Sequence, residues 1–444
     1  MNPRNPSNKR LWCFVIGFLL LVILLPVILA MLPVWDGPPV DDSDMQFVHR
    51  EIPDEQNAFE LFRKAEAAMA PRPDLKVWNQ WNDDPQAHAD EIRAWVDSNH
   101  EALRLLAEGV ALGDYQTPER KHYTDGFTWL NPSLEMVRLL GLASRIKLDP
   151  VERMDLNLLQ LRLAERNFRA GSSFIEAMGG IAAYSSAFGA LFDTLQYAEM
   201  DMANLRRFHE ALGDLQMDKE RMVRVFQTEY HFFVLYMQEV RLGTSWHDML
   251  LDYDFLDAPY MRPFTRPGTW GYQEENTKRL YLEYYRQPIA YLRGEIPYDR
   301  LEASFSEIDK LIDRSTPIYR KTHNMAGKLL VAAQWRPEPL VSKYKENRAD
   351  LHALQLMTAL HVFHRENGNL PDTLDALVPD YLAEVPADPF DGQPFRYLPA
   401  EARIYSIGKN REDNGGSIRA RAYNRNATSR NESPDRVYGV LEGI

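Results

Sequence analysis

The stretch SSFIEAMGGIAAYSSAFGALFDTLQYA, residues 172–198, decides the fold of this chain. It has little polar content, and its small residues allow other helices to approach closely: Gly179, Gly180, Ala182, Ala183, Ala187, Gly189 and Ala190. A helix that is apolar on all its faces belongs inside a larger protein. The sequence therefore predicts a central helix that is surrounded by other helices.

The neighbouring segments predict those surrounding helices. Each of 133–147 and 150–170 carries one wide apolar stripe, as expected for a helix buried on one side. The stripes are Leu134, Val137, Leu140, Leu142 and Ile146, and then Met154, Leu158, Leu161 and Leu163. Further helices are expected at 57–70, 85–112, 201–214, 217–241, 274–293 and 298–313. Because proline, glycine, asparagine and aspartate separate these segments, we expect irregular antiparallel helical hairpins over 57–340. No strict 34-residue repeat supports a regular solenoid.

Residues 252–275 interrupt the helical rhythm with aspartate, proline and aromatic side chains. We expect a long loop there, packed across the helices. The helix that follows carries a group of tyrosines: Tyr281, Tyr284, Tyr285 and Tyr291. Such a group could grip a ligand, but interior packing is the favoured interpretation, with the hydroxyls reaching the surface.

From about residue 343 the chain changes character. A helix is expected to continue to about Glu366, with Gly368 as its stop signal. A short helix, a turn at 388–394 and two strand-like pieces, 395–398 and 403–408, come next. The alternation of side chains in these pieces predicts an antiparallel hairpin with one face on the helix.

The stretches ALHVFHRENGNLPDTLDALVPDYLAEVPADPFDGQPFRYL and IYSIGKNREDNGG resemble the head domain of the major pseudopilin of type II secretion systems. The shared motifs are the helix ending in NG-x-(L/Y)-P, the VPADPFDG-x-PFRY turn and the YS-(I/L)-G strand before an Asp/Gly-rich loop. The resemblance implies a small α+β pilin-like module at 343–416, followed by a polar tail at 417–444. The rest of the chain resembles uncharacterised anchored proteins of Planctomycetes-like bacteria.

The pseudopilin resemblance also implies a candidate calcium site. In that family the loop after the YS-L-G strand binds calcium through main-chain carbonyls and aspartates, which suit this ion. The matching side chains are Asp413 and, further along the chain, Asp435. The competing and favoured interpretation is a solvated Asx-Gly turn, because basic residues and the polar insertion 419–436 dilute the acidic character of the loop.

Residues 11–32 form a run of 22 residues without a charge. At about 1.5 Å per helical residue, this run spans the ~30 Å hydrocarbon core of a bilayer. Basic residues precede it and aspartates follow it, so the positive-inside rule puts residues 1–10 in the cytoplasm. We expect a single-pass inner-membrane protein with a periplasmic ectodomain, joined to the span by a linker at 33–56. A cleaved signal peptide is the alternative.

The run also differs from a pseudopilin stem. Its start, RLWCFV at residues 10–15, has neither the glycine nor the glutamate of a prepilin-peptidase site, and about 310 residues separate the run from the pilin-like module. The sequence therefore predicts a permanent tether that does not assemble into a fibre.

Composition narrows the function further. Three of the 51 basic residues and none of the 64 acidic ones precede the run, so the ectodomain carries a formal net charge of 48 minus 64, or −16. Such a surface repels nucleic acid. Cys13 is the sole cysteine and lies in the apolar run, so there is no intramolecular disulfide and no thiol catalysis.

No established catalytic motif occurs, neither G-x-S-x-G, H-E-x-x-H, P-loop nor G-x-G-x-x-G. His352, His361 and His364 share one helix near Glu366, but the first two point to opposite faces, and zinc needs three or four protein ligands. Weaker candidates are His231, His247 and Asp248, the acidic runs Asp83-Asp84 and Asp252/Asp254/Asp257, and the aromatic set Trp78, Trp81 and Trp95. Solvated loops and core packing are their favoured interpretations.

We therefore expect a non-enzymatic, membrane-anchored scaffold or protein-interaction protein of the bacterial envelope. One helix contacts the lipid bilayer, an envelope protein is the expected partner, and calcium is the one candidate cofactor. The alternatives are an envelope hydrolase with a cleft near 247–257, for which 252–275 would serve as a lid, and a helical-hairpin receptor for peptides.

Overall fold

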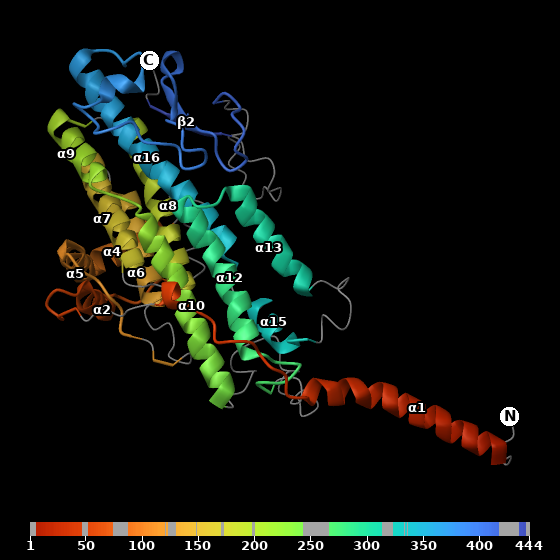
Figure 1. Ribbon diagram of the computed structural model, residues 1–444. Helices are drawn as coiled ribbons and strands as arrows, with labels where there is room; N and C mark the ends of the chain where they lie inside the picture. The colour runs from red at the N-terminus through yellow and green to blue at the C-terminus, as the bar shows by residue number, and fades with distance from the viewer. Residues whose placement is uncertain are drawn as a thin grey trace. The chain divides into compact units, whose positions relative to one another are not determined.

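Helices and one small antiparallel sheet make up the described part of the chain (Figure 1). The structure is a computed structural model that describes residues 6–46, 52–73, 88–119, 121–122, 130–147, 149–169, 173–197, 200–242, 266–312, 323–332, 334, 336–416 and 435–440. The expected class, mainly helical with short antiparallel strands, is confirmed.

The chain divides into two compact units. Unit 1 comprises Met1–Val48, Arg120–Gly126 and Phe226–Glu338, and unit 2 comprises His49–Glu119, Phe127–Val225 and Pro339–Ile444. The expected helical region 57–340 is therefore shared between both units, and the C-terminal module lies in unit 2 together with most of the helical hairpins.

Unit 2 is built on packed helical pairs. Its helices are α2 (Ala58–Ala68), α4 (Ala89–Ser98), α5 (His100–Ala111), α6 (Leu130–Ile146), α7 (Pro150–Arg169), α8 (Phe174–Tyr197), α9 (Met202–Gly213) and α16 (Pro337–Asn367). The helix predicted over 172–198 is α8, which packs against α6 and α7. It is less enclosed than predicted, because Ala182, Ser185 and Gly189 lie on an exposed face.

Asn99 divides the helix that was expected over 85–112. Its side chain donates to the carbonyl of Trp95 (2.7 Å) and accepts from the N–H of Ala70 (2.9 Å). Asparagine competes in this way with the backbone bonds of a helix. The result is two helices, α4 and α5, instead of one.

The helix α16 lies between α8 and the sheet (Figure 1). On one side Asn347 donates to the carbonyl of Ile181 in α8 (2.9 Å). On the other, Asp350 accepts two bonds from Arg436, both 2.6 Å, and one from the hydroxyl of Tyr438 (2.7 Å). This helix therefore joins the helical pairs of unit 2 to its sheet.

The sheet contains one strand more than the expected hairpin. β1 (Arg396–Leu398) pairs with β2 (Arg403–Ser406), as expected, and β2 also pairs with β3 (Arg436–Gly439), both antiparallel. β3 lies in the segment 417–444 that was expected to be a polar tail, so that boundary was wrong. The polar insertion 419–436 before this strand favoured the interpretation of the whole segment as a tail.

Unit 1 contains α1 (Pro6–Met31), the short η1 (Ser43–Met45), α10 (Lys219–Leu242) from Phe226 onward, α12 (Glu274–Arg293), α13 (Tyr298–Ile312) and α15 (Met325–Ala332). The helices α12, α13 and α15 pack on one another. Tyr281 stacks on Phe233 of α10 with a centroid distance of 3.6 Å, and Tyr281, Tyr284 and Tyr285 are all buried. Interior packing is confirmed for these three tyrosines, whereas Tyr291 is half-buried. The expectation that the hydroxyls reach the surface is wrong for Tyr281, whose hydroxyl is buried.

Two other features of unit 1 were not expected. The helix α15 lies in a stretch for which no helix was predicted. The segment expected to be a linker is not a free spacer, because Met45 is buried and Tyr230 of α10 donates a 2.7 Å bond to Asp42. Of the expected loop 252–275, only residues from 266 onward belong to the described part of the chain.

Candidate functional site

The turn at 388–394 organises a polar network in the C-terminal module. The N–H of Asp388 donates to the carbonyl of Gln393 (2.7 Å), and the N–H of Gly392 donates to the carbonyl of Asp388 (2.8 Å). Gly392 has a φ of +76°, a conformation that glycine adopts without strain. The DPFDG sequence therefore closes into a tight turn that contains both Asp388 and Asp391.

The side chain of Asp388 is fully buried and satisfied by four donors. They are the N–H of Phe390 (2.9 Å), the hydroxyl of Ser406 (2.9 Å), the N–H of Ile407 (2.9 Å) and the Nη1 of Arg396 (3.2 Å). Burial raises the pKa of Asp388 above its ordinary value, although these bonds oppose the effect. This carboxylate ties the turn to the end of β2.

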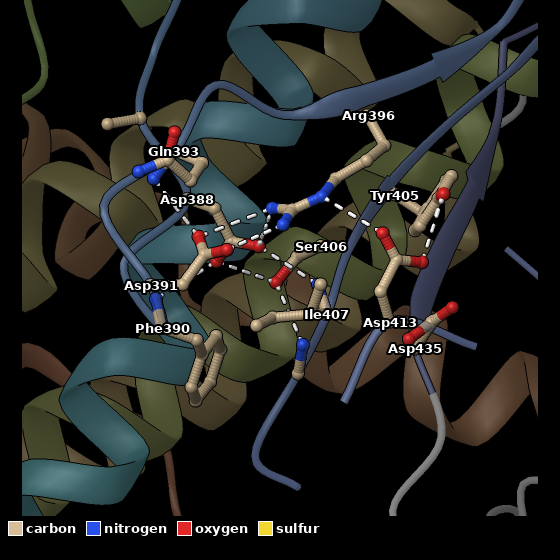
Figure 2. A network of polar contacts seen from close by, with 12 residues as sticks. Asp388, Phe390, Asp391, Gln393, Arg396, Tyr405, Ser406, Ile407, Asp413 and Asp435 are labelled. Atoms are coloured by element: carbon tan, nitrogen blue, oxygen red, sulfur yellow. Dashed lines mark hydrogen bonds and ion pairs between the residues drawn. The ribbon is translucent and has the colours of Figure 1, made fainter. Parts of the chain in front are cut away.

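Arg396 of β1 lies among three carboxylates (Figure 2). Besides Asp388, its guanidinium bonds to Asp391, with Nη2 to Oδ2 at 2.5 Å, and its Nε lies 3.5 Å from Oδ2 of Asp413. Burial alone would raise the pKa of Asp391, but the bonds from Arg396 hold it below its ordinary value. A cation of the protein thus occupies the centre of this acidic group.

The two predicted calcium ligands lie at the same loop. Asp413 accepts from the hydroxyl of Tyr405 (3.2 Å) and from the N–H of Gly415 (2.9 Å). Asp435 accepts from the N–H groups of Asn414 (3.0 Å) and Gly416 (2.8 Å). Asp435 belongs to the segment 417–444, which was expected to be a separate tail. Its bonds to Asn414 and Gly416 close this loop.

This arrangement fits calcium poorly. The ion takes six to eight oxygen ligands, whereas both carboxylates here accept N–H bonds, and a guanidinium lies beside Asp413. In the part of the chain that the structure describes, no group of three or more His, Cys, Asp or Glu side chains is placed to hold a metal ion. To bind calcium, the carboxylates of Asp413 and Asp435 would have to give up the N–H bonds that they accept. Calcium binding by these two residues stays a prediction.

Sequence reasoning missed the residues at the centre of this network. They are Arg396 and, beside the turn, Lys345 of α16; neither was among the predicted site residues. The Nζ of Lys345 lies 5.2 Å from the centroid of the Phe390 ring, and burial lowers its pKa to about 8. The sequence offered one signal for Lys345: a lysine at a position that faces the buried side of the predicted helix.

The histidines of α16 do not converge. His352 bonds through Nδ1 to the carbonyl of Ala387 (2.8 Å). Nε2 of His361 and Nδ1 of His364 are buried and have no hydrogen-bond partner among the described residues. Burial lowers the pKa of His352 and of His361 to about 4 in each case, so both rings are neutral at pH 7.

The remaining candidates give no site within the described residues. Trp95 is buried and donates to the carbonyl of Ala70 (3.2 Å), which is core packing, and the His231 ring lies 6.2 Å from that of Phe232. Several candidates lie outside the described residues: Trp78, Trp81, Asp83, Asp84, His247, Asp248, Asp252, Asp254 and Asp257.

Comparisons with known protein families, with curated proteins and with solved structures find no match to this chain.

Proposed function

We propose that this chain is a membrane-anchored extracytoplasmic scaffold or protein-interaction protein of a bacterial envelope, with α1 as its tether. The observation that carries the proposal is the exposure of apolar side chains on α1: Phe14 is 77% exposed, Phe18 60% and Leu21 57%. Water does not favour such a surface on a helix, whereas the hydrocarbon core of a bilayer does.

A second helix competes for the role of tether. Among the described residues, the stretch Phe174–Leu195 of α8 is long and apolar enough to cross a membrane, and the apolar stretch Trp12–Leu21 of α1 is shorter. However, the window in α8 is 50% buried, and Ile181, Phe188 and Leu191 lie in the core of unit 2. We assign the tether to α1, since the uncharged run of the sequence continues to residue 32.

The charges on either side of α1 support one orientation. Lys9 and Arg10 precede the uncharged run, and Asp36 and Asp41 follow it. The positive-inside rule then places the N-terminus in the cytoplasm and both units in the periplasm.

The C-terminal module is proposed to be pseudopilin-like. Supporting this, α16 is followed by Gly368 with a φ of +80°, and the DPFDG turn and the β1–β2 hairpin come next, in the order of the family's motifs. The buried bonds of Asp388 join the turn to Ser406 of the YS-I-G strand, so two of these motifs meet in space.

The ectodomain is proposed to act as a scaffold and not as an enzyme. In support, the polar groups of the module bind one another: Arg396 pairs with Asp388 and Asp391, and Arg436 pairs with Asp350. Networks of this kind rigidify a domain and specify its packing. A rigid module suits the presentation of a surface to a partner.

The anchor is tested by extraction of membranes at alkaline pH. The full-length chain should stay with the bilayer and keep its intact mass, whereas a cleaved signal peptide would yield a shortened and soluble product. Leu20→Arg with Leu24→Arg should release the chain, because each arginine costs about 2.5–3.5 kcal/mol at the centre of a span. Leu20→Ile with Leu24→Ile is the matched control and should stay bound.

The scaffold is tested by affinity purification of the full-length, C-terminally tagged chain from detergent extracts, followed by mass spectrometry. One or more envelope proteins should be recovered in every replicate and be absent when α1 alone carries the tag. Failure to recover any reproducible envelope partner would rule out the scaffold.

A further inference from the structure

The segment that follows α1 is hydrogen-bonded to the rest of unit 1 from its first residues. We call residues 33–46 the strap. Pro33 forms a β-bridge with Thr269, and the N–H of Val34 donates to the carbonyl of Gly268 (3.1 Å). The turn at Gly268 is therefore held next to the end of the tether.

The strap then continues along α12. The carboxylate of Asp36 accepts from the N–H groups of Glu275 (2.7 Å) and Asn276 (3.0 Å), two of the donors that the first turn of a helix leaves unpaired. This carboxylate therefore fixes the start of α12 close to the tether.

Further along, arginines of α12 hold the strap. Arg279 donates to the carbonyl of Pro38 (3.3 Å), and Arg286 donates to the carbonyl of Asp41 (2.8 Å) and to the carboxylate of Asp44 (2.9 Å). Successive strap residues thus meet successive turns of α12. The strap and α12 run in the same direction, so the N-terminus of α12 lies at the tether and its C-terminus points away from it.

The distance from the membrane follows from the length of the chain. Val34 follows Leu32, the last residue of the uncharged run, by two positions, and an extended residue covers at most about 3.3–3.6 Å. Including the bond to Gly268, the turn lies at most about 10 Å from the hydrocarbon edge. It is therefore inside the head-group layer, which is about 5–7 Å thick on each face of the bilayer, or at its outer side.

The side chains at this position suit that layer. Trp35 is 81% exposed, and tryptophan is enriched at membrane interfaces because its ring is apolar and its N–H is polar. Arg266 and Pro267 of the turn are exposed as well, and a guanidinium pairs readily with phosphate. The two carboxylates nearby have partners within unit 1: Asp36 accepts from helix N–H groups, and Asp44 pairs with Arg286.

We propose that Trp35 and the turn Arg266–Thr269 bind in the phospholipid head-group layer, so that unit 1 stands on the bilayer with the N-terminus of α12 facing it. This inference rests on the proposed tether. It adds a second membrane contact, and it fixes which end of α12 is presented to a periplasmic partner.

The test uses single cysteines for an environment-sensitive fluorophore in the full-length chain, with Cys13→Ser as background. Pro267→Cys reports on the turn. Glu295→Cys is the matched control, because it is exposed in the same unit and follows the C-terminus of α12. A helix of 20 residues is about 30 Å long, so the two labels should differ clearly in depth.

Both variants are reconstituted into phosphatidylcholine–phosphatidylglycerol vesicles, and quenching by head-group-labelled spin lipids is compared. We expect at least threefold stronger quenching at position 267 than at position 295. Equal and weak quenching at both positions in a chain that resists alkaline extraction would overturn this inference and leave the tether intact. A chain that is extracted from the vesicles would overturn both proposals.

The strap itself is tested in the same assay. Arg286→Ala removes the bonds to Asp41 and Asp44 but keeps the tether, and it should reduce the quenching at position 267 at least twofold by loosening unit 1. Arg293→Ala, at the far end of the same helix, should leave the quenching unchanged. If Arg286→Ala has no more effect than Arg293→Ala, the strap does not hold the turn at the head groups.

Discussion

At the scale of single residues, the guanidinium of Arg396 pairs with Asp388 and Asp391 and lies beside Asp413. Arg396→Ala would leave three carboxylates without this cation, one of them fully buried. We expect the free energy of unfolding of unit 2 to fall by about 1.5–3 kcal/mol, the range for hydrogen bonds to charged groups. Urea unfolding followed by circular dichroism measures the change.

Arg403→Ala is the control for that measurement. Arg403 lies on the neighbouring strand and pairs with the exposed Glu401, and exposed ion pairs contribute only about 0–1 kcal/mol. If the two alanine variants lose equal stability, the network around Arg396 does not support the module.

The calcium prediction belongs to the same scale. An ion that binds only the folded state stabilises it, by about 2.7 kcal/mol at a concentration 100 times the dissociation constant. If Asp413 and Asp435 hold calcium, the unfolding midpoint should be higher in calcium than in chelator, and Asp435→Asn should abolish the difference. Identical midpoints in calcium and in chelator for the unaltered chain would show that it does not bind calcium.

At the scale of helices and strands, close approaches limit which residues fit. Gly327 of α15 leaves no room for a methyl group, since a Cβ there would lie 1.8 Å from Oγ1 of Thr277 in α12. Gly327→Ala should destabilise unit 1 by about 1–3 kcal/mol, the usual cost of overpacking. Gly189→Ala is the control: Gly189 lies on the exposed face of α8 with nothing within 4 Å, so alanine there should be neutral or stabilise the protein. Thermal unfolding of both variants measures these changes, and an equal midpoint for the two would contradict the close approach at Gly327.

The start of α12 gives a second prediction at this scale. Asp36→Ala removes the acceptor of two backbone N–H groups, and loss of such a cap costs about 1 kcal/mol. Asp36→Asn keeps an oxygen acceptor and should recover most of the stability. Hydrogen exchange at Glu275 and Asn276 reports the change directly, and equal protection in both variants would contradict the capping role.

At the scale of the whole molecule, buried histidines couple the stability of unit 2 to pH. Burial lowers the pKa of His352 and of His361 to about 4, against an ordinary value of 6.5. Between these values the unfolded chain binds protons that the folded chain does not. Stability should therefore be full above pH 6.5 and fall as the pH decreases toward 4, by up to about 1.4 kcal/mol per pH unit for each histidine.

The control replaces one of these histidines. His361→Gln carries no titrating group, so its stability should depend less steeply on pH over the same range. A pH profile for His361→Gln that matches that of the unaltered chain would show that His361 is not held in its neutral form.

The path of the chain also belongs to this scale. It passes from unit 2 to unit 1 within α10, between Val225 and Phe226, and returns at Pro339, near the start of α16. No proline, glycine or change in composition marks the division inside α10, because the helix itself is continuous. A boundary of this kind is defined by packing and not by a linker, so sequence reading placed 57–340 in one region.

The sequence by itself determined the features that depend on neighbouring residues. The periodic stripes predicted most helices of both units, Gly368 marked the end of α16, and the alternation at 395–408 predicted the β1–β2 hairpin. The uncharged run at 11–32 gave the candidate tether in the same way, because length and hydropathy are local properties.

Only the tertiary structure decided which distant residues meet. Asp36 caps a helix that begins more than 230 positions later, and Asp350 pairs with Arg436 across 86 positions. Contacts between distant residues also explain three other features: the buried Asp388, the closure of the Asp413 loop by Asp435, and the strap along α12. Such contacts depend on the path of the chain, and each is made by one or two side chains without a periodic pattern, so nothing in the local sequence distinguishes them from solvated loops.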